Sequence, residues 1–374
     1  MTPKVASYLD SSSLATPCLV VDLDRVAANY QALHAALPAA KIYYAVKANP
    51  APQILALLAA KGACFDAASL PEIEACLAAG AQADAISFGN TVKKAAAIAA
   101  AYARGVPLFA FDSIEELEKI ARHAPGAKVY CRIAVANEGA DWPLTKKFGT
   151  TVDRARELML AAPGLGLVPH GLSFHVGSQQ TATPAYELAI AKVAMLFTDL
   201  KANGLELKML NLGGGLPVSY REEVPGVETF SDAIMNTLIA HFGNDLPEIL
   251  IEPGRAIVGN AGVVVAEVVL VCRRIAADER RWVYLDIGRF GGLAETEGEA
   301  IRYRITAGNG ATGPVALAGP SCDGVDIMYE KTAYQLPLDL QAGDRVLIHD
   351  TGAYVTTYAS QGFNGFAPLE EHYL

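Results

Sequence analysis

The segment Tyr43-Tyr44-Ala45-Val46-Lys47-Ala48-Asn49-Pro50 is apolar up to its end except for one lysine, and it predicts a buried strand over Tyr43–Ala48. Seven more apolar stretches follow it, each separated from the next by a helix-like segment rich in Ala, Leu, Glu and Lys. These seven are Ala63–Asp66, Ala85–Phe88, Leu108–Phe111, Val129–Val135, Gly171–His175, Met209–Leu212 and Ile249–Glu252. Eight strands alternating with helices are typical of a closed TIM-like (β/α)8 barrel. A doubly wound open sheet is the alternative, because periodicity alone does not establish closure.

The helix expected over Ser113–Arg122 carries a start signal. Ser113 is a good N-cap residue, and Glu116 three positions later completes the pattern of a capping box.

The pattern changes after Arg255, where short strands follow one another without good helices. The expected strands are Val263–Cys272, Trp282–Asp286, Ile301–Ile305, Val315–Leu317 and Arg345–His349, and Thr16–Leu23 is a candidate to join them. We therefore expect an α/β barrel over residues 24–255 and an all-β domain made of residues 1–23 and 256–374.

Composition narrows the class of protein. Of 374 residues, 52% are hydrophobic and 19% charged, which is typical of a globular enzyme. The net charge of −10 argues against nucleic acid or an anionic membrane as partner. Met1–Asp10 lacks the apolar core of a signal peptide, and the six cysteines form no C-x-x-C pair. We expect a reduced, cytoplasmic setting and no metal site.

Polar residues fall where the predicted strands end. They are Lys47, Asp66, Arg132, His175 and Glu252. Each alone is compatible with a satisfied structural side chain, and Lys47 with a solvent-facing strand end. In a barrel, however, the carboxyl ends of all the strands meet at one mouth, where catalytic residues lie.

The seventh predicted strand runs into Gly213-Gly214-Gly215, and the eighth is followed by Arg255. Consecutive glycines let backbone N–H groups approach an anion, and a guanidinium binds phosphate with two parallel hydrogen bonds. A glycine triplet is also compatible with a simple flexible turn. In barrels the loops after strands seven and eight commonly bind phosphate.

Five short motifs occur in one order along nearly the whole chain. They are Tyr44-Ala45-Val46-Lys47, His175-Val176-Gly177-Ser178-Gln179, Glu252-Pro253-Gly254-Arg255, Gly319-Pro320-Ser321-Cys322-Asp323-Gly324 and Phe363-Asn364-Gly365-Phe366. In this the sequence resembles the fold-type III pyridoxal-phosphate decarboxylases, the group of ornithine, lysine and diaminopimelate decarboxylases.

The resemblance implies pyridoxal 5'-phosphate as cofactor, bound to Lys47 as a Schiff base and stacked against His175. The residues implied for the phosphate are Ser178, Gly213, Gly214, Gly215, Arg255 and Tyr354. Asp66 and Arg132 would line the pocket near Lys47. Glu252 would pair with the pyridine nitrogen, where a carboxylate favours decarboxylation; racemases of this fold have an arginine there.

The resemblance also implies roles for the residues of the Cys322 motif. The cysteine would return a proton to the substrate's α-carbon, although a small buried thiol is the plain alternative. Asp323 would bind the distal ammonium group of the substrate, and Phe363 would contact the substrate. Cys322-Asp323-Gly324 resembles ornithine decarboxylases, whereas diaminopimelate decarboxylases have Cys-Glu-Ser. The implied reaction is decarboxylation of L-ornithine to putrescine in polyamine biosynthesis.

Lysine is a close second substrate. In eukaryotic ornithine decarboxylases an Asn-Asp-Gly-x-Tyr segment gives a second acid for the distal amine. The corresponding segment here, Asp286 to Gly292, resembles bacterial enzymes that also convert lysine to cadaverine, and water or Glu295 is a candidate to replace that second acid. One methylene is worth only about 1–3 kcal/mol in a pocket. The resemblance further implies a homodimer with shared active sites and an inter-subunit pair of Lys147 with Asp326. A diaminopimelate decarboxylase, a racemase and a non-catalytic cofactor-binding homologue are the alternatives.

Overall fold

The computed structural model describes residues 1–143, 147–274, 276–277 and 279–374. The chain forms two compact units. The barrel unit contains Ala27–Pro217 and Val224–Gly254, and the β unit contains Met1–Val26, Val218–Glu223 and Arg255–Leu374.

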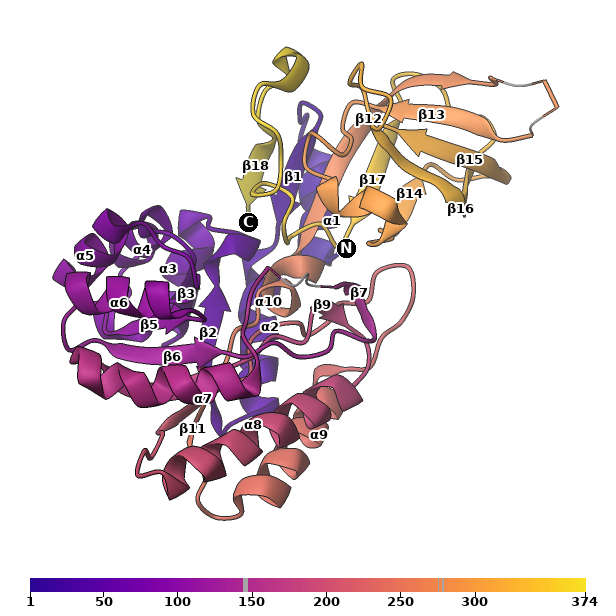
Figure 1. Cartoon of the computed structure of the whole chain (residues 1–374). Coiled ribbons are helices and arrows are strands. Elements are labelled where there is room, and N and C mark those ends of the chain that lie inside the picture. The colour runs from indigo at the N-terminus through magenta and orange to yellow at the C-terminus, as the bar shows by residue number, and fades with distance from the viewer. Residues whose placement is uncertain (144–146, 275, 278) are drawn as a thin grey trace. The chain divides into compact units, whose positions relative to one another are not determined.

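Eight parallel strands close the barrel, as predicted, in the order β10-β11-β2-β3-β4-β5-β6-β8 (Figure 1). They are β2 (Ala40–Ala45), β3 (Cys64–Ala67), β4 (Ile86–Phe88), β5 (Leu108–Phe111), β6 (Lys128–Arg132), β8 (Val168–Ser173), β10 (Met209–Asn211) and β11 (Glu248–Ile251). β10 pairs with β11 on one side and with β8 on the other, so the sheet has no free edge. Closure rules out the open doubly wound sheet.

The helices α2 to α9 alternate with these strands, and Figure 1 shows them around the outside of the barrel. They are α2 (Leu23–Ala36), α3 (Pro52–Ala60), α4 (Leu70–Ala78), α5 (Ala95–Ala103), α6 (Ile114–His123), α7 (Val152–Ala161), α8 (Pro184–Ala202) and α9 (Val227–Phe242). A small hairpin, β7 (Ala140–Trp142) with β9 (Ser178–Gln180), adds to the loops.

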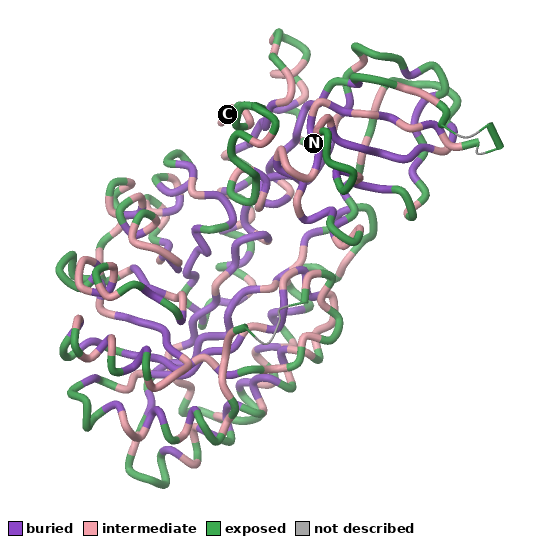
Figure 2. The backbone as a smooth tube through the Cα atoms, turned by 45° about the horizontal axis from the view of Figure 1, so that its top comes forward, coloured by how far each residue is buried: buried purple, intermediate pink, exposed green. Residues whose placement is uncertain are grey.

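Several barrel strands end earlier than the apolar pattern predicted. β2 stops at Ala45, and Lys47 lies in a following 3₁₀ turn, Val46–Ala48, so the prediction that it lies within the strand is wrong. His175 and Glu252 also lie just beyond β8 and β11. The apolar residues continue past the last ladder hydrogen bond because loop residues such as Val46, Phe174 and Val176 are buried as well. Figure 2 shows buried residues in the interior of the chain and exposed residues on its outer turns.

The barrel is filled by side chains from its own strands. Tyr43, Leu108, Tyr130, Met209 and Leu250 form one buried cluster in it. Burial at about 25 cal/mol per Å² makes such a cluster a main source of stability. It also gives the strand ends a rigid base.

The β unit is a mostly antiparallel sheet with a short α-helix, α1 (Pro3–Ser11). Its strands are β1 (Cys18–Val21), β12 (Gly262–Cys272), β13 (Arg281–Leu285), β14 (Ile305–Ala307), β15 (Thr312–Ala318), β16 (Ile327–Pro337), β17 (Arg345–His349) and β18 (Glu370–Tyr373). β1 pairs with β12 and β18, so the N-terminal segment joins this sheet as expected. α10 (Arg255–Val258) leads into it.

Three elements of the β unit differ from the prediction. The strand expected at Ile301–Ile305 begins only at Ile305, and β16 and β18 were not predicted. β16 alternates exposed and buried residues and contains Glu330 and Lys331, so it lacks the continuous apolar run of the other strands.

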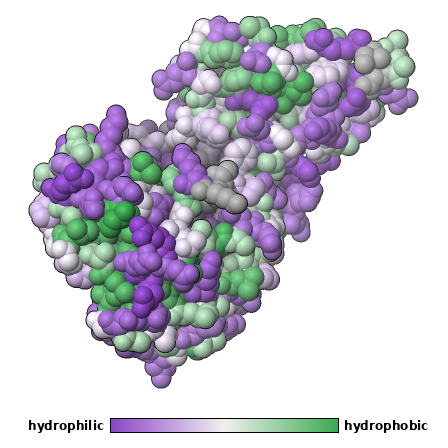
Figure 3. Space-filling model, in the orientation of Figure 1, coloured by the Kyte–Doolittle hydropathy of each residue, from purple (hydrophilic) through white to green (hydrophobic). Residues whose placement is uncertain are grey.

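The outer surface of the barrel unit mixes hydrophilic and hydrophobic side chains on the face seen in Figure 3. Among the helices of the described residues, none is long and apolar enough to cross a membrane.

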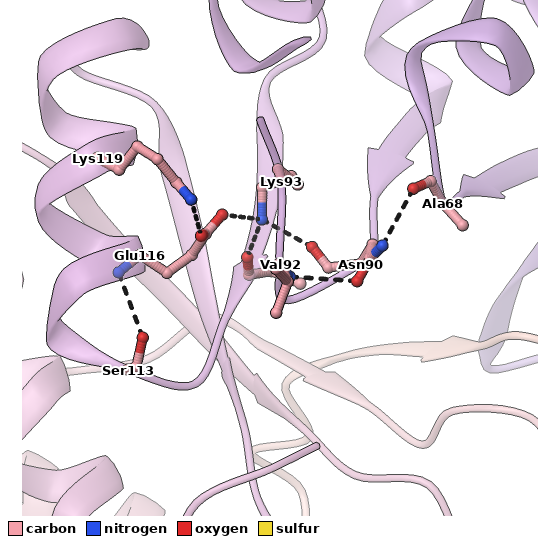
Figure 4. Close-up of polar contacts among 8 residues, drawn as sticks. Ala68, Asn90, Val92, Lys93, Ser113, Glu116 and Lys119 are labelled. Carbon is pink, nitrogen blue, oxygen red and sulfur yellow. Dashed lines mark hydrogen bonds and ion pairs between the residues drawn. The ribbon is translucent and has the colours of Figure 1, made fainter. Parts of the chain in front are cut away.

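A buried ion pair ties α6 to the loop after β4 (Figure 4). The Lys93 amine lies 3.0 Å from Glu116 Oε1, and the side chains are 0% and 5% exposed. Lys93 also donates to the carbonyls of Asn90 (2.7 Å) and Ala110 (2.6 Å). Burial lowers the pKa of Lys93 to about 8. Ser113 caps α6 as predicted, but the Glu116 carboxylate binds Lys93 and Lys119, so the expected capping box is only half formed.

We predict that Glu116→Gln destabilises the protein by about 3–5 kcal/mol, because it leaves the buried Lys93 charge without its partner. The double variant Lys93→Met, Glu116→Leu should lose less than the single variant, since both charges are gone. Denaturant unfolding measures the free energies. The control Arg154→Ala removes an exposed pair with Glu157 and should change stability by no more than about 1 kcal/mol. Equal losses for Glu116→Gln and this control would contradict the prediction.

Candidate active site

Lys47 is exposed at the carboxyl end of β2, between the buried residues Val46 and Ala48. The two neighbours anchor the turn while the lysine side chain stays accessible. The positive charge of Lys47 acts on both Asp66 and His175, which places the three groups at the same mouth of the barrel.

Asp66 lies within β3 and is 6% exposed. Burial, followed by the nearby Glu252 carboxylate, raises its pKa well above the ordinary value, whereas Lys47 lowers it. Among the described residues, its buried Oδ1 has no hydrogen-bond partner. An added Cβ at Gly89 would lie 1.8 Å from that oxygen, so the loop after β4 has to lack a side chain here.

Glu252 follows β11 and is held by a residue that the sequence interpretation missed. The side-chain amide of Asn211, the last residue of β10, donates a hydrogen bond to Glu252 Oε1. The amide oxygen of Asn211 accepts from the backbone N–H of Gly213 at 2.9 Å. Asn211 therefore joins the carboxylate to the first glycine of the triplet.

The glycine triplet packs closely on backbone. An added Cβ would lie 2.2 Å from the Phe174 carbonyl oxygen at Gly213, 2.5 Å from that of Glu252 at Gly214, and 2.4 Å from that of Gly177 at Gly215. Gly213 and Gly215 also have φ of +66° and +114°, which favours glycine. Within the described part of the chain, the N–H groups of Gly214 and Gly215 have no hydrogen-bond acceptor. These two donors suit an anion.

His175 lies between these groups as a neutral ring. The backbone N–H of Gly177 donates to its Nδ1 at 3.1 Å, so the proton of the neutral ring is on Nε2. Burial, together with the charges of Arg132 and Lys47, lowers its pKa well below the ordinary value. Arg132 in turn lies over the Phe148 ring, 5.3 Å from its centre. A neutral, half-buried imidazole suits stacking on an aromatic ring.

Below the mouth, the hydroxyl groups of Tyr130 and Ser87 are 2.9 Å apart. Burial, then Glu252 and Asp66, raise the pKa of Tyr130 well above its ordinary value. Tyr130 therefore stays neutral beneath the two carboxylates.

In the β unit, Arg255 is buried and its guanidinium binds Glu295 with two hydrogen bonds of 2.6 and 2.8 Å. It also donates to the Tyr220 hydroxyl at 2.6 Å and lies 4.9 Å from the centre of the Tyr354 ring. Glu295 is 4% exposed. Both of its oxygens accept from Arg255, and the suggestion that Glu295 serves as the second acid for a substrate amine stays a prediction.

The Cys322 motif forms an exposed loop of the β unit. Cys322 is exposed, and its backbone N–H donates to Asn364 Oδ1 at 2.9 Å. Asp323 is exposed too, and its Oδ1 accepts from the Val325 N–H at 3.0 Å. Phe363 packs against Phe290 with the ring centres 4.6 Å apart and the rings tilted by 43°. The plain reading of Cys322 as a buried thiol is therefore wrong.

Asp326 shapes this loop from inside. It is 3% exposed, and its carboxylate accepts from the N–H groups of Arg289 (2.8 Å) and Ser321 (3.1 Å). Lys147 is exposed in the barrel unit, close to the Phe148 ring. The predicted pair of Lys147 with Asp326 of another subunit stays a prediction.

The barrel unit thus brings together Lys47, Asp66, Arg132, His175 and Glu252, as the strand-end pattern predicted. Ser178 begins β9, just beyond this group in sequence. Asn211 and Gly89 were missed. Asn211 could have been found as a polar residue at the end of an apolar strand, directly before the glycine triplet, whereas nothing in the sequence marks Gly89.

Comparison with known proteins agrees with this geometry. Residues 23–259 match the family described as "Pyridoxal-dependent decarboxylase, pyridoxal binding domain". A lysine/ornithine decarboxylase of Selenomonas ruminantium is 37% identical over 356 residues, covering 94% of this chain and 88% of that protein. Antizyme inhibitor 2 of Xenopus laevis is 32% identical, with 95% and 80% covered.

A solved structure has the same architecture. The lysine/ornithine decarboxylase from Vibrio vulnificus, complexed with putrescine, has a TM-score of 0.90 and 31% identity, and covers 100% of this chain and 99% of its own. Fold and mouth together define a cofactor-dependent enzyme on an alanine-racemase-like barrel with a β domain. The chain belongs to the pyridoxal-dependent decarboxylases, whose cofactor is pyridoxal phosphate.

The described residues fit that cofactor. The N–H groups of Gly214 and Gly215 suit its phosphate, and the accessible Lys47 amine suits its aldehyde. Glu252 offers a carboxylate already oriented by Asn211. The predicted family and cofactor are therefore confirmed.

We predict that Gly89→Ala displaces the Asp66 carboxylate, because the new Cβ would overlap its Oδ1. Overpacking of this kind destabilises a protein by about 1–3 kcal/mol, and cofactor affinity should fall as well. Thermal unfolding and a fluorescence titration with pyridoxal phosphate measure the two effects. Gly164→Ala is the matched control, since no atom lies within 4 Å of its added Cβ. If both variants behave like the wild type, Asp66 is not held in this way.

Proposed function

We propose that the protein decarboxylates L-ornithine to putrescine and, as a close second substrate, L-lysine to cadaverine. The observation that carries the proposal is the joint placement of Lys47, Asp66, His175 and Glu252 at the barrel mouth. The relative from Selenomonas ruminantium, described as a lysine/ornithine decarboxylase, supports the substrate pair.

When bound, pyridoxal phosphate supplies an electron sink for the bond that breaks as carbon dioxide leaves. The Lys47 amine would hold the cofactor covalently, and the neutral ring of His175 would stack on it. Glu252 would hold a proton at the pyridine nitrogen, and Asp66 and Arg132 would line the pocket beside Lys47. Loss of the Glu252 carboxylate would weaken transition-state stabilisation by about 2–4 kcal/mol.

The N–H groups of Gly214 and Gly215 would bind the phosphate, together with Ser178, Tyr354 and Arg255. A guanidinium has five donors, and Arg255 already uses three of them on Glu295 and Tyr220. Glu295 and Tyr220 would therefore fix the plane of the guanidinium, whose positive charge would attract the phosphate.

Asp323 would bind the distal ammonium group of the substrate. It lies on an exposed loop where its side chain is bent back toward Val325, so the carboxylate is pre-oriented. A substrate without a distal ammonium would leave this carboxylate desolvated and unpaired, which would favour diamino acids over neutral ones. Phe363 would contact the methylene chain. Water or Glu295 would make the second contact to the amine.

We further propose a cytoplasmic homodimer in which the Cys322 loop of one subunit completes the site of the other. Cys322 is exposed on its own unit, where a thiol serving only to fill a core would be buried. From there the thiol could return a proton to the α-carbon after decarboxylation. The free cysteines described in the chain are in keeping with a reducing compartment.

A non-catalytic regulator is the second candidate function, because an antizyme inhibitor is among the similar proteins. Retention of Lys47, Glu252, Arg255 and Cys322 argues against it. The racemase and diaminopimelate alternatives are disfavoured by Glu252 and Asp323, respectively.

Turnover with four amino acids tests the proposal. The purified, cofactor-loaded protein is supplied separately with ornithine, lysine, arginine and meso-diaminopimelate, and carbon dioxide and amine are quantified. We expect putrescine from ornithine, and cadaverine from lysine at a rate within about 100-fold, since one methylene separates them. Release from diaminopimelate alone would contradict the role of Asp323. A loaded protein inactive on all four would favour the regulator.

Complementation tests the shared site. Lys47→Ala and Cys322→Ala should each be nearly inactive for clean amine formation. Mixed dimers restore one intact site, so activity should recover to about a quarter of the wild type after random exchange. Mass spectrometry of differently tagged subunits confirms the exchange. No recovery in demonstrably mixed dimers would place both residues in a site within one chain.

A further inference from the structure

The Asn211 side chain hydrogen-bonds to both ends of the proposed cofactor site within the barrel unit. Its amide N–H donates to Glu252, at the ring end, and its amide oxygen accepts from Gly213, at the phosphate end. Asn211 is 1% exposed, so neither bond is exchanged readily with water. The Gly213 carbonyl accepts from the Glu252 N–H at 2.8 Å, which closes a ring of contacts.

We propose that Asn211 is a positioning residue that aims the Glu252 carboxylate and couples it to the glycine triplet. The inference rests on the proposed role of Glu252 at the cofactor's ring nitrogen. One carboxylate oxygen is used by Asn211, which leaves the other to meet the cofactor. The same side chain also fixes Gly213. Phosphate binding at the glycine triplet and the position of the Glu252 carboxylate at the ring nitrogen therefore both depend on Asn211.

The residue type is decisive here, since only a side chain with both a donor and an acceptor makes the two bonds at once. Aspartate has the same shape, but it has a donor only when protonated. The ionisable groups that interact with Glu252 are Asp66 on β3 and Tyr130 on β6. Lys47 and Arg132 act in turn on Asp66 and on His175. A second carboxylate at position 211 would add to the repulsion between Asp66 and Glu252.

Asn211→Asp gives the first test, with the holoenzyme. At low pH the new carboxyl shares a proton with Glu252 and replaces the amide donor, so cofactor affinity and turnover should approach the wild type. As pH rises that proton is lost, and the dissociation constant of pyridoxal phosphate should rise at least about tenfold, with a new alkaline limb in turnover. Asn203→Asp, an exposed change of equal charge on the turn after α8, should match the wild type. A wild-type pH profile for Asn211→Asp would overturn the proposal.

A double-variant cycle covers the case in which Asn211→Asp folds poorly. Asn211→Ala should weaken cofactor binding at least about tenfold in the wild type but by less than about threefold in Glu252→Gln, because the residue acts through the carboxylate. Equal losses in both backgrounds would show a merely structural role of Asn211. Both tests measure cofactor binding, and that readout stands apart from the substrate assays. A wild type that does not bind the cofactor at all would instead overturn the proposed function.

Discussion

Two carboxylates face each other at the mouth of the barrel, and the arrangement around them depends on keeping both in place. Asp66 is buried, and Glu252 together with burial raises its pKa. The raised pKa favours the neutral form of Asp66 beside Glu252, Lys47 and Arg132 partly oppose that shift, and a hydrogen bond from Asn211 holds Glu252. In the resulting site the Asn211 amide orients Glu252, Asp66 packs against Gly89, and the Lys47 side chain is accessible.

Backbone geometry provides the frame for these charges. The strands β2, β8 and β11 end a residue or two before the side chains that carry the chemistry, so Lys47, His175 and Glu252 lie on short turns anchored in buried neighbours. The glycines pack directly against the carbonyls of adjacent loops, which allows two N–H groups to remain available for an anion. Rigid strands below and close-packed glycines above together pre-organise the site.

Much of this was predictable from the sequence, for physical reasons. The apolar strands and their count indicated a barrel, and polar residues at strand ends have few places to point except its mouth. The exact strand ends were not predictable, because apolar loops at Val46 and Val176 are buried like strands. β16 was missed because its solvent-facing charges interrupt the apolar pattern. Contacts distant in sequence, such as Gly89 with Asp66 or Arg255 with Glu295, leave no local pattern at all.

Lys47 is proposed as the amine that carries the cofactor, and covalent trapping identifies that amine. The holoenzyme is reduced with borohydride, digested, and mapped by mass spectrometry for the pyridoxyl group. Lys93 is the natural competitor, because burial lowers its pKa to about 8, but its side chain is fully buried and bound to Glu116. We expect one modified lysine, Lys47, at near one group per chain. Modification of Lys93 or another lysine, with Lys47 intact, would show that Lys47 does not carry the cofactor.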